Sequence, residues 1–174
     1  MKTAVFLDRD GVLNEPVVRD GRPYPPAGVE QLIVVPDAEA SLARLKQHGF
    51  ILIVVTNQPD VQRGTCSLAV VESINKRLAQ TLPLDDFFTC YHDDSDHCDC
   101  RKPLPGLFIK AAAKHEIDLA RSYMIGDRWR DIDAGAAAGC RTILIDRHYD
   151  ECAPQSKPDY VAQSLSAACD WILR

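Results

Sequence analysis

Two aspartates separated by a single residue, Asp8 and Asp10, follow directly on a short apolar run near the start of the chain. The run predicts a buried strand, with the aspartates at its carboxyl end beside the turn residue Gly11. Ligands of open α/β sheets bind beyond the carboxyl ends of the strands, so paired carboxylates there can act as nucleophile, acid, base or metal ligands. The same residues also fit a simple polar turn, so the rest of the chain has to decide between these interpretations.

A dense group of cysteine and histidine residues occupies positions 90–100. Cys90 and His92 form a Cys-x-His pair, and five residues separate it from the Cys-x-Cys pair of Cys98 and Cys100. Three thiolates and one imidazole make the closed four-ligand set of structural zinc sites. His97 is an alternative fourth ligand, but Cys90 and His92 share one face of a predicted strand end, which favours His92. We therefore expect structural zinc here rather than two pairs of free cysteines.

The spacing of apolar residues predicts alternating strands and helices. Strands are expected at about 3–8, 50–55, 87–91, 122–125 and 142–145, and helices at about 37–49, 68–81, 105–115, 131–139 and 164–173. Such alternation is typical of a doubly wound α/β fold with a mostly parallel sheet. Neither a linker nor an internal repeat interrupts the pattern, so residues 1–174 are expected to form one domain that includes the zinc loop.

The connection from Asn14 to Pro36 is long and rich in proline, which excludes a helix over most of its length. A short apolar piece from Gln31 to Val35 is expected to pair locally. Long connections in compact domains are usually functional, and this one follows the acidic strand end directly.

The second predicted strand ends in Thr56 and Asn57. If the connection between the first two strands is a right-handed crossover, these residues lie at the same sheet edge as Asp8. A phosphate oxygen could then accept hydrogen bonds from the Thr56 hydroxyl and from neighbouring backbone N–H groups. Both residues also form turns after strands, and the pattern alone does not separate the two roles.

Four polar groups follow one another in a fixed order along the chain. Together with the predicted fold they resemble the haloacid dehalogenase (HAD) superfamily of phosphohydrolases, and the resemblance covers essentially the whole chain. It implies a Rossmann-like sheet. The groups are Asp8-Arg9-Asp10-Gly11, Thr56-Asn57, Arg101-Lys102-Pro103, and Gly126-Asp127 with Asp131.

The resemblance implies a catalytic role for several of these residues. Asp8 would be the nucleophile that forms an aspartyl-phosphate. Asp10 would protonate the leaving oxygen and then activate water, so it must carry a proton during part of the cycle. Thr56, Asn57 and Lys102 would hold the transferring phosphoryl group.

The resemblance also implies a magnesium site made of Asp8, Asp127 and the main-chain carbonyl of Asp10, with Asp131 in the outer shell. A carboxylate that attacks a phosphate dianion meets like-charge repulsion, so a divalent cation and a lysine such as Lys102 are needed to neutralise the phosphoryl oxygens. Mg²⁺ prefers hard oxygen ligands and keeps several waters, which suits a site with few carboxylates.

Within the superfamily, the zinc residues followed by Arg-Lys-Pro resemble the capless D-glycero-D-manno-heptose 1,7-bisphosphate phosphatases and the related histidinol-phosphate phosphatases. The heptose branch is favoured, which implies a phosphorylated sugar substrate. Arg101 would contact the distal phosphate or the sugar, and Arg128 another phosphate oxygen. The Pro-rich loop at 16–26 would line the leaving-group pocket. Pro59-Asp60 departs from the heptose pattern and brings an added carboxylate near an anionic sugar.

Three other functions remain possible. A phospho-accepting receiver domain also gathers acids, a threonine and a lysine around Mg²⁺, but it needs neither Asp10 as an acid nor a zinc loop. A zinc-containing binding module with a degenerate site is disfavoured because every motif residue is present. A DNA 3′-phosphatase would need a basic or aromatic groove for the strand, and the sequence offers none.

Composition narrows the class of partner and the compartment. The 174 residues carry a net charge of −5 without a Lys/Arg block, which argues against nucleic acid and anionic membranes as partners. No apolar stretch approaches membrane-spanning length, and Lys2 precedes a strand too short for a signal sequence. Seven cysteines with one tight cluster fit a reducing compartment. We expect a cytoplasmic monomer.

Overall fold

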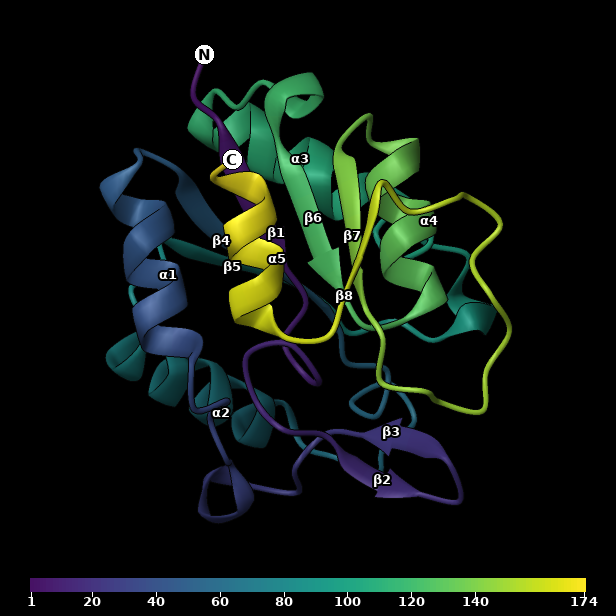
Figure 1. Ribbon diagram of the computed structural model, residues 1–174. Helices are drawn as coiled ribbons and strands as arrows, with labels where there is room; N and C mark the ends of the chain where they lie inside the picture. The colour runs from purple at the N-terminus through teal and green to yellow at the C-terminus, as the bar shows by residue number, and fades with distance from the viewer.

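The computed structural model describes residues 1–174 and is built around a six-stranded sheet. The strand order is β5-β4-β1-β6-β7-β8, and every neighbouring pair is parallel (Figure 1). The strands are β1 (Ala4–Leu7), β4 (Ile51–Asn57), β5 (Asp86–Cys90), β6 (Tyr123–Gly126), β7 (Arg141–Ile145) and β8 (Tyr160–Ala162). The predicted doubly wound α/β fold is confirmed.

Helices cover both faces of the sheet, so β1 is apolar at every position and β4 is apolar from Ile51 to Val55. Leu7 of β1 packs into the core under α1 (Ala38–Gln47), α2 (Leu68–Thr81) and α5 (Leu165–Ile172). Phe6 points to the other face, where α3 (Gly106–His115) and α4 (Trp129–Ala137) lie. Short 3₁₀ turns occur at η1 (Val29–Gln31), η2 (Asp94–Asp96) and η3 (Leu119–Arg121). None of the helices combines the length and apolar character that a membrane span requires.

The register of the sheet brings the polar strand ends together. Leu7 pairs with Val54 on one side and with Ile125 on the other. Asp8 therefore leaves the sheet at the same edge as the ends of β4 and β6. This edge, as expected for a parallel sheet, is where the functional side chains of the chain meet.

A small hairpin outside the main sheet was not predicted. It joins β2 (Val17–Arg19) to β3 (Arg22–Tyr24) in antiparallel register, and it projects below the sheet in the view of Figure 1. Its two-residue turn, Asp20-Gly21, has positive φ at both residues (49° and 72°), as type I′ turns require. The predicted local pairing of residues 31–35 occurs as a single antiparallel bridge between Asn14 and Val34.

Candidate active site

Three buried carboxylates meet at the edge of the sheet. Asp8 follows β1, Asp127 follows β6 and Asp131 lies in the first turn of α4, and their oxygens lie within 4.8 Å of one another. Burial, followed by the charge of Asp131, raises the pKa of Asp8 from 3.8 to about 6. Burial and the charges of Asp8 and Asp131 also raise the pKa of Asp127. The three groups repel one another strongly unless a cation lies between them.

The donor set of this cluster fits magnesium. All three side chains offer hard carboxylate oxygens, which Mg²⁺ prefers. Asp127 Oδ1 is buried and accepts no hydrogen bond, so it is available as a ligand. Tyr149 donates a 2.8 Å hydrogen bond to the other oxygen, Oδ2, and thereby fixes the orientation of the carboxylate.

Gly11 leaves room for this arrangement. Its φ is +92°, and a Cβ at this position would lie 1.7 Å from Asp127 Oδ2. Any larger residue would displace the carboxylate or the turn. The glycine of the Asp-x-Asp-Gly sequence is therefore required by the close approach of the first strand end to Asp127.

Lys102 is the cation that the structure itself places at the cluster. Its Nζ donates to Asp8 Oδ1 at 2.9 Å, to Asp131 Oδ1 at 2.5 Å and to the Val55 carbonyl at 2.8 Å. Burial alone would lower the pKa of Lys102, but the charges of Asp131 and Asp8 outweigh it and raise the pKa. A buried, charged lysine beside the first aspartate is suited to neutralise an anion that approaches Asp8.

Two further residues hold Lys102 in place through three hydrogen bonds. The side-chain amide of Asn57 donates to the Lys102 carbonyl at 3.0 Å and accepts from the Lys102 N–H at 3.1 Å. Arg130 donates to the same carbonyl at 3.2 Å. The structure thus gives Asn57 a positioning role, and its expected contact with phosphate stays a prediction.

Asp10 lies outside the carboxylate cluster, and three donors orient it. Gln58 Nε2 donates to Oδ2 at 2.8 Å, Arg9 Nη2 to Oδ2 at 3.0 Å, and Asn14 Nδ2 to Oδ1 at 3.0 Å. Gln58 also donates to the Thr56 hydroxyl at 3.0 Å. Asp10 thus faces the same cavity as Asp8, with a fixed orientation suited to proton transfer.

Sequence reasoning missed most of these supporting partners. Arg9 is fully buried and reaches Asn75 as well as Asp10. Its position between two aspartates could have suggested a buried ion pair. Gln58 directly follows the recognised Thr56-Asn57 pair, whereas Tyr149 lies in a loop with no motif, and no signal in the sequence marked it.

The predicted zinc ligands, between residues 90 and 100, form a second cluster. Arg101 and Lys102 follow it directly in the chain, and Lys102 contacts the carboxylate cluster. The Sγ atoms of Cys90, Cys98 and Cys100 are 3.1–3.8 Å apart, and His92 Nδ1 lies 3.4 Å from Cys100 Sγ. A tetrahedral zinc with bonds of roughly 2.3 Å needs sulfur atoms roughly 3.8 Å apart.

The chemistry of the cysteines also suits a metal. All seven cysteines of the chain are free thiols, so no disulfide competes for these four ligands. Burial opposes ionisation of Cys98, yet hydrogen bonds from the backbone N–H groups of Arg101 and Cys100 lower its pKa to about 7. Burial raises the pKa values of Cys90 and Cys100, which a bound cation would offset. His97 is absent from the cluster, whereas His92 belongs to it. The donor set therefore fits structural zinc, with His92 rather than His97 as the imidazole ligand.

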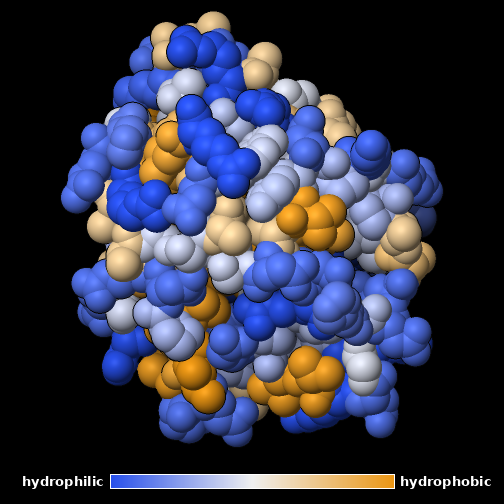
Figure 2. Space-filling model, viewed as in Figure 1, coloured by the Kyte–Doolittle hydropathy of each residue, from blue (hydrophilic) through white to orange (hydrophobic).

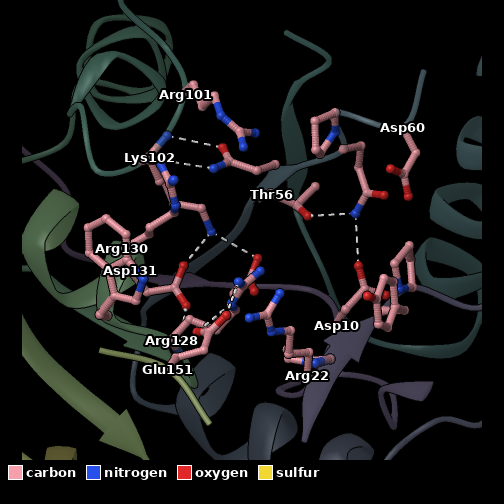
Figure 3. A pocket seen from close by; sticks show the side chains of 18 of the residues that line it. Asp10, Arg22, Thr56, Asp60, Arg101, Lys102, Arg128, Arg130, Asp131 and Glu151 are labelled. Carbon is pink, nitrogen blue, oxygen red and sulfur yellow. Dashed lines mark hydrogen bonds and ion pairs between the residues drawn. The ribbon is translucent and has the colours of Figure 1, made fainter. Parts of the chain in front are cut away.

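A polar cavity of about 520 Å³ lies over Asp8, Asp10 and Lys102 (Figure 3). Residues 22–25 of the hairpin line it, as expected for the Pro-rich loop. Arg101 and Arg128, both predicted to contact substrate, line it as well but pair with acids. Arg101 Nε donates to Asp94 at 2.7 Å, and Arg128 pairs with Glu151 through Nε and Nη2.

Comparisons with known proteins agree with this geometry. Residues 99–168 match the family model described as HAD-hydrolase-like. The D-glycero-D-manno-heptose-1,7-bisphosphate 7-phosphatase of Thermosynechococcus vestitus is 33% identical, over 98% of this chain and 95% of the relative. The chain belongs to the HAD phosphatase family.

Other relatives of this HAD phosphatase point the same way. The D-glycero-beta-D-manno-heptose-1,7-bisphosphate 7-phosphatase of Escherichia coli O6:H1 is 36% identical, over 94% of this chain and 90% of the relative. The crystal structure of the D,D-heptose 1,7-bisphosphate phosphatase from B. bronchiseptica, complexed with magnesium and phosphate, superposes with a TM-score of 0.82 at 31% identity. That comparison covers 98% of both chains. The predicted HAD fold and phosphatase activity are confirmed.

Proposed function

We propose that this HAD phosphatase removes one phosphate, the 7-phosphate, from D-glycero-D-manno-heptose 1,7-bisphosphate. The observation that carries the proposal is the buried contact of Lys102 Nζ with both Asp8 and Asp131 beneath a polar cavity. Such a site is built to accept a phosphoryl group. Relatives named for the heptose bisphosphate align over most of their length, which supports the choice of sugar.

In the proposed reaction, the Asp8 carboxylate attacks phosphorus, and the bond from phosphorus to the sugar oxygen breaks. Asp10 gives its proton to that oxygen, so the sugar leaves as a neutral hydroxyl. Asp10 then takes a proton from water, whose oxygen attacks the aspartyl-phosphate. Inorganic phosphate is released and Asp8 is restored. Lys102 and the Thr56 hydroxyl contact the phosphoryl oxygens and stabilise their charge.

Asp8, Asp127 and the main-chain carbonyl of Asp10 would hold magnesium, with Asp131 fixed nearby by Lys102 and by the Arg128 N–H. When bound, the metal offsets the repulsion between the nucleophile and the phosphate dianion. Burial and the neighbouring carboxylates raise the pKa values of Asp8 and Asp127, and a divalent cation bound between them would favour their charged forms.

Zinc would act through structure. The four ligands Cys90, His92, Cys98 and Cys100 complete the coordination of zinc and leave no open position for substrate. We therefore propose that the metal stabilises the conformation of the loop that precedes Arg101 and Lys102. Arg101 is fastened to this loop by its bonds to Asp94 and to the His92 carbonyl.

Arg128 and Arg101 differ in the number of free N–H donors that they can offer to a substrate. Arg128 uses Nε and Nη2 for Glu151, and Nη1 remains for a phosphate oxygen. Arg101 has few donors to spare, so a contact with the sugar is the simpler role for it. We also propose that the protein is a monomer of the cytoplasm, whose reducing environment suits seven free thiols.

A phosphate-release screen with magnesium tests the proposed function. The substrates are D-glycero-D-manno-heptose 1,7-bisphosphate, the corresponding 7-phosphate, histidinol phosphate and p-nitrophenyl phosphate. We expect the highest kcat/KM with the bisphosphate. A preference for histidinol phosphate would replace the sugar substrate with the related alternative, and no steady turnover of any ester would contradict the phosphatase assignment.

A further inference from the structure

The cavity over Asp8 is lined by many more cations than one phosphoryl group needs. Six cationic side chains contribute to the wall: Arg22, Arg63, Arg101, Lys102, Arg128 and Arg130. Two phosphate groups on one substrate would account for such a wall, provided that at least one cation is free to bind the second group.

Five of these six cations are already paired with carboxylates. Lys102 contacts the catalytic cluster, Arg63 pairs with Asp93, and Arg128 pairs with Glu151. Arg101 and Arg130 share Asp94. A phosphate that bound any of them would have to displace or share an existing partner.

Arg22 is different, because its side chain makes neither an ion pair nor a hydrogen bond in the structure. Figure 3 shows it extending from the hairpin into the cavity, with no dashed line to any neighbour. A guanidinium presents donors that match phosphate in a bidentate geometry. Arg22 can therefore take an anion without losing another contact.

The backbone that carries Arg22 has a defined path beside the cavity, and the side chain itself is exposed. Arg22 begins β3 directly after the Asp20-Gly21 turn, and the ring of Pro23 restricts the chain behind it. The Asp150 N–H donates to the Gly21 carbonyl at 3.0 Å, which ties the hairpin to the loop after β7. The same loop supplies Glu151, the partner of Arg128. The hairpin and the active site are thus joined through one loop.

We infer that Arg22 is a specificity-determining residue that binds the second phosphate of the substrate, the one that is not transferred. The inference rests on the proposed function, since a monophosphate substrate would leave Arg22 without a ligand. It predicts that Arg22 contributes to the affinity for a bisphosphate and not to the chemistry at Asp8.

The chain offers a matched control on the same hairpin. Arg19 pairs directly opposite Arg22 in the register of β2 and β3, but its guanidinium lies over the ring of Tyr24, 5.6 Å from the centroid. Arg19 does not line the cavity. Arg22→Gln and Arg19→Gln therefore remove the same charge from the same element, and only one change reaches the cavity.

Steady-state kinetics on the magnesium-loaded enzyme test the inference with two substrates, D-glycero-D-manno-heptose 1,7-bisphosphate and the 7-phosphate. For Arg22→Gln we expect KM for the bisphosphate to rise about tenfold or more, as for the loss of a charge-assisted contact, with kcat nearly unchanged. KM for the 7-phosphate should stay within about twofold, and Arg22→Lys should recover part of the loss. Arg19→Gln should change neither substrate.

The possible outcomes separate this inference from the proposed function. A wild-type enzyme with no preference for the bisphosphate would overturn the proposed substrate and the role of Arg22 with it. A wild-type preference that Arg22→Gln retains would overturn the role of Arg22 alone. Equal losses on both substrates, with unchanged thermal unfolding, would assign Arg22 to the transferred phosphate instead and would also overturn the inference.

Discussion

At the scale of single residues, Asp8 combines reactivity with a cost in stability. Its pKa is raised from 3.8 to about 6, so between these pH values the folded protein holds a proton that the unfolded chain releases. The free energy of unfolding of the magnesium-free protein therefore falls as pH rises through this window, by about 3 kcal/mol from Asp8. Below pH 4 this cost disappears because both states are protonated.

Asp8→Asn should remove this dependence. In magnesium-free buffer at pH 7 we expect the variant to be more stable than the wild type, and the difference should shrink toward pH 4. Lys102 keeps Asp131 as its partner, so the lysine does not become an unpaired buried charge. Urea unfolding at both pH values provides the measurement. Equal differences at pH 4 and pH 7 would contradict the account.

Tyr149 should act on magnesium affinity through Asp127. Its hydroxyl orients the carboxylate, and the loss of such an outer contact commonly weakens metal binding roughly 10–100-fold. We expect Tyr149→Phe to need more Mg²⁺ for half-maximal activity, with kcat at saturating Mg²⁺ much less affected. Tyr160→Phe is the control, because Tyr160 stacks on Trp171 away from the cavity. An unchanged Mg²⁺ requirement in Tyr149→Phe would rule out this role.

The candidate catalytic residues at the strand ends were easier to predict than the residues that hold them in position. Asp8, Lys102 and Asp127 were identified from motifs, and the parallel register explains why they meet. Tyr149 and Glu151 were not identified, because their contacts depend on the path of the loop after β7. Short motifs constrain residues near the sheet, whereas loop side chains find partners through tertiary contacts that no local spacing encodes.

At the scale of elements, the zinc loop should control the position of Lys102. We expect Cys98→Ser to lower kcat strongly, because a small displacement of a charge-stabilising group can cost orders of magnitude in rate. Far-UV circular dichroism should remain close to wild type, since the larger core cluster does not include this loop and Cys98 packs only at the edge of the smaller one. Cys66→Ser is the matched control, because Cys66 lies outside the cluster.

Elemental analysis completes this test. We expect about one zinc per chain in the wild type and in Cys66→Ser, as for one four-ligand site, and a large loss in Cys98→Ser. Full activity in a protein shown to contain no zinc would refute the structural assignment. Turnover with zinc alone, after removal of magnesium, would point instead to a catalytic zinc.

The strands that the sequence analysis did not predict are only three residues long. The five long strands and five helices were predicted within a few residues of their observed positions, because each has a clear apolar period. The three-residue strands β2, β3 and β8 have no such period, and Pro23 argues against a strand. Asp20-Gly21 was an available hairpin signal, since this dipeptide favours type I′ turns.

At the scale of the whole molecule, charge is arranged locally. The chain is acidic overall, with a net charge of −5, yet the cavity over Asp8 gathers six cationic side chains. The face seen in Figure 2 is largely hydrophilic, with apolar residues in small separate patches. Seven carboxylates line the same wall, so an anionic substrate would meet single cations such as Lys102 and Arg22 and not a positive field over the whole cavity.

The most direct test of the proposed mechanism is a search for phosphate on Asp8 during turnover. The reaction with the bisphosphate is quenched in acid, and the peptide that contains Asp8 is analysed by mass spectrometry. We predict one added phosphoryl group on Asp8. With p-nitrophenyl phosphate, whose leaving group needs no proton, we predict more of it in Asp10→Asn, where water is activated poorly. Asp8→Asn should carry none and release no phosphate. Continued phosphate release by Asp8→Asn, at a rate near that of the wild type, would contradict the mechanism.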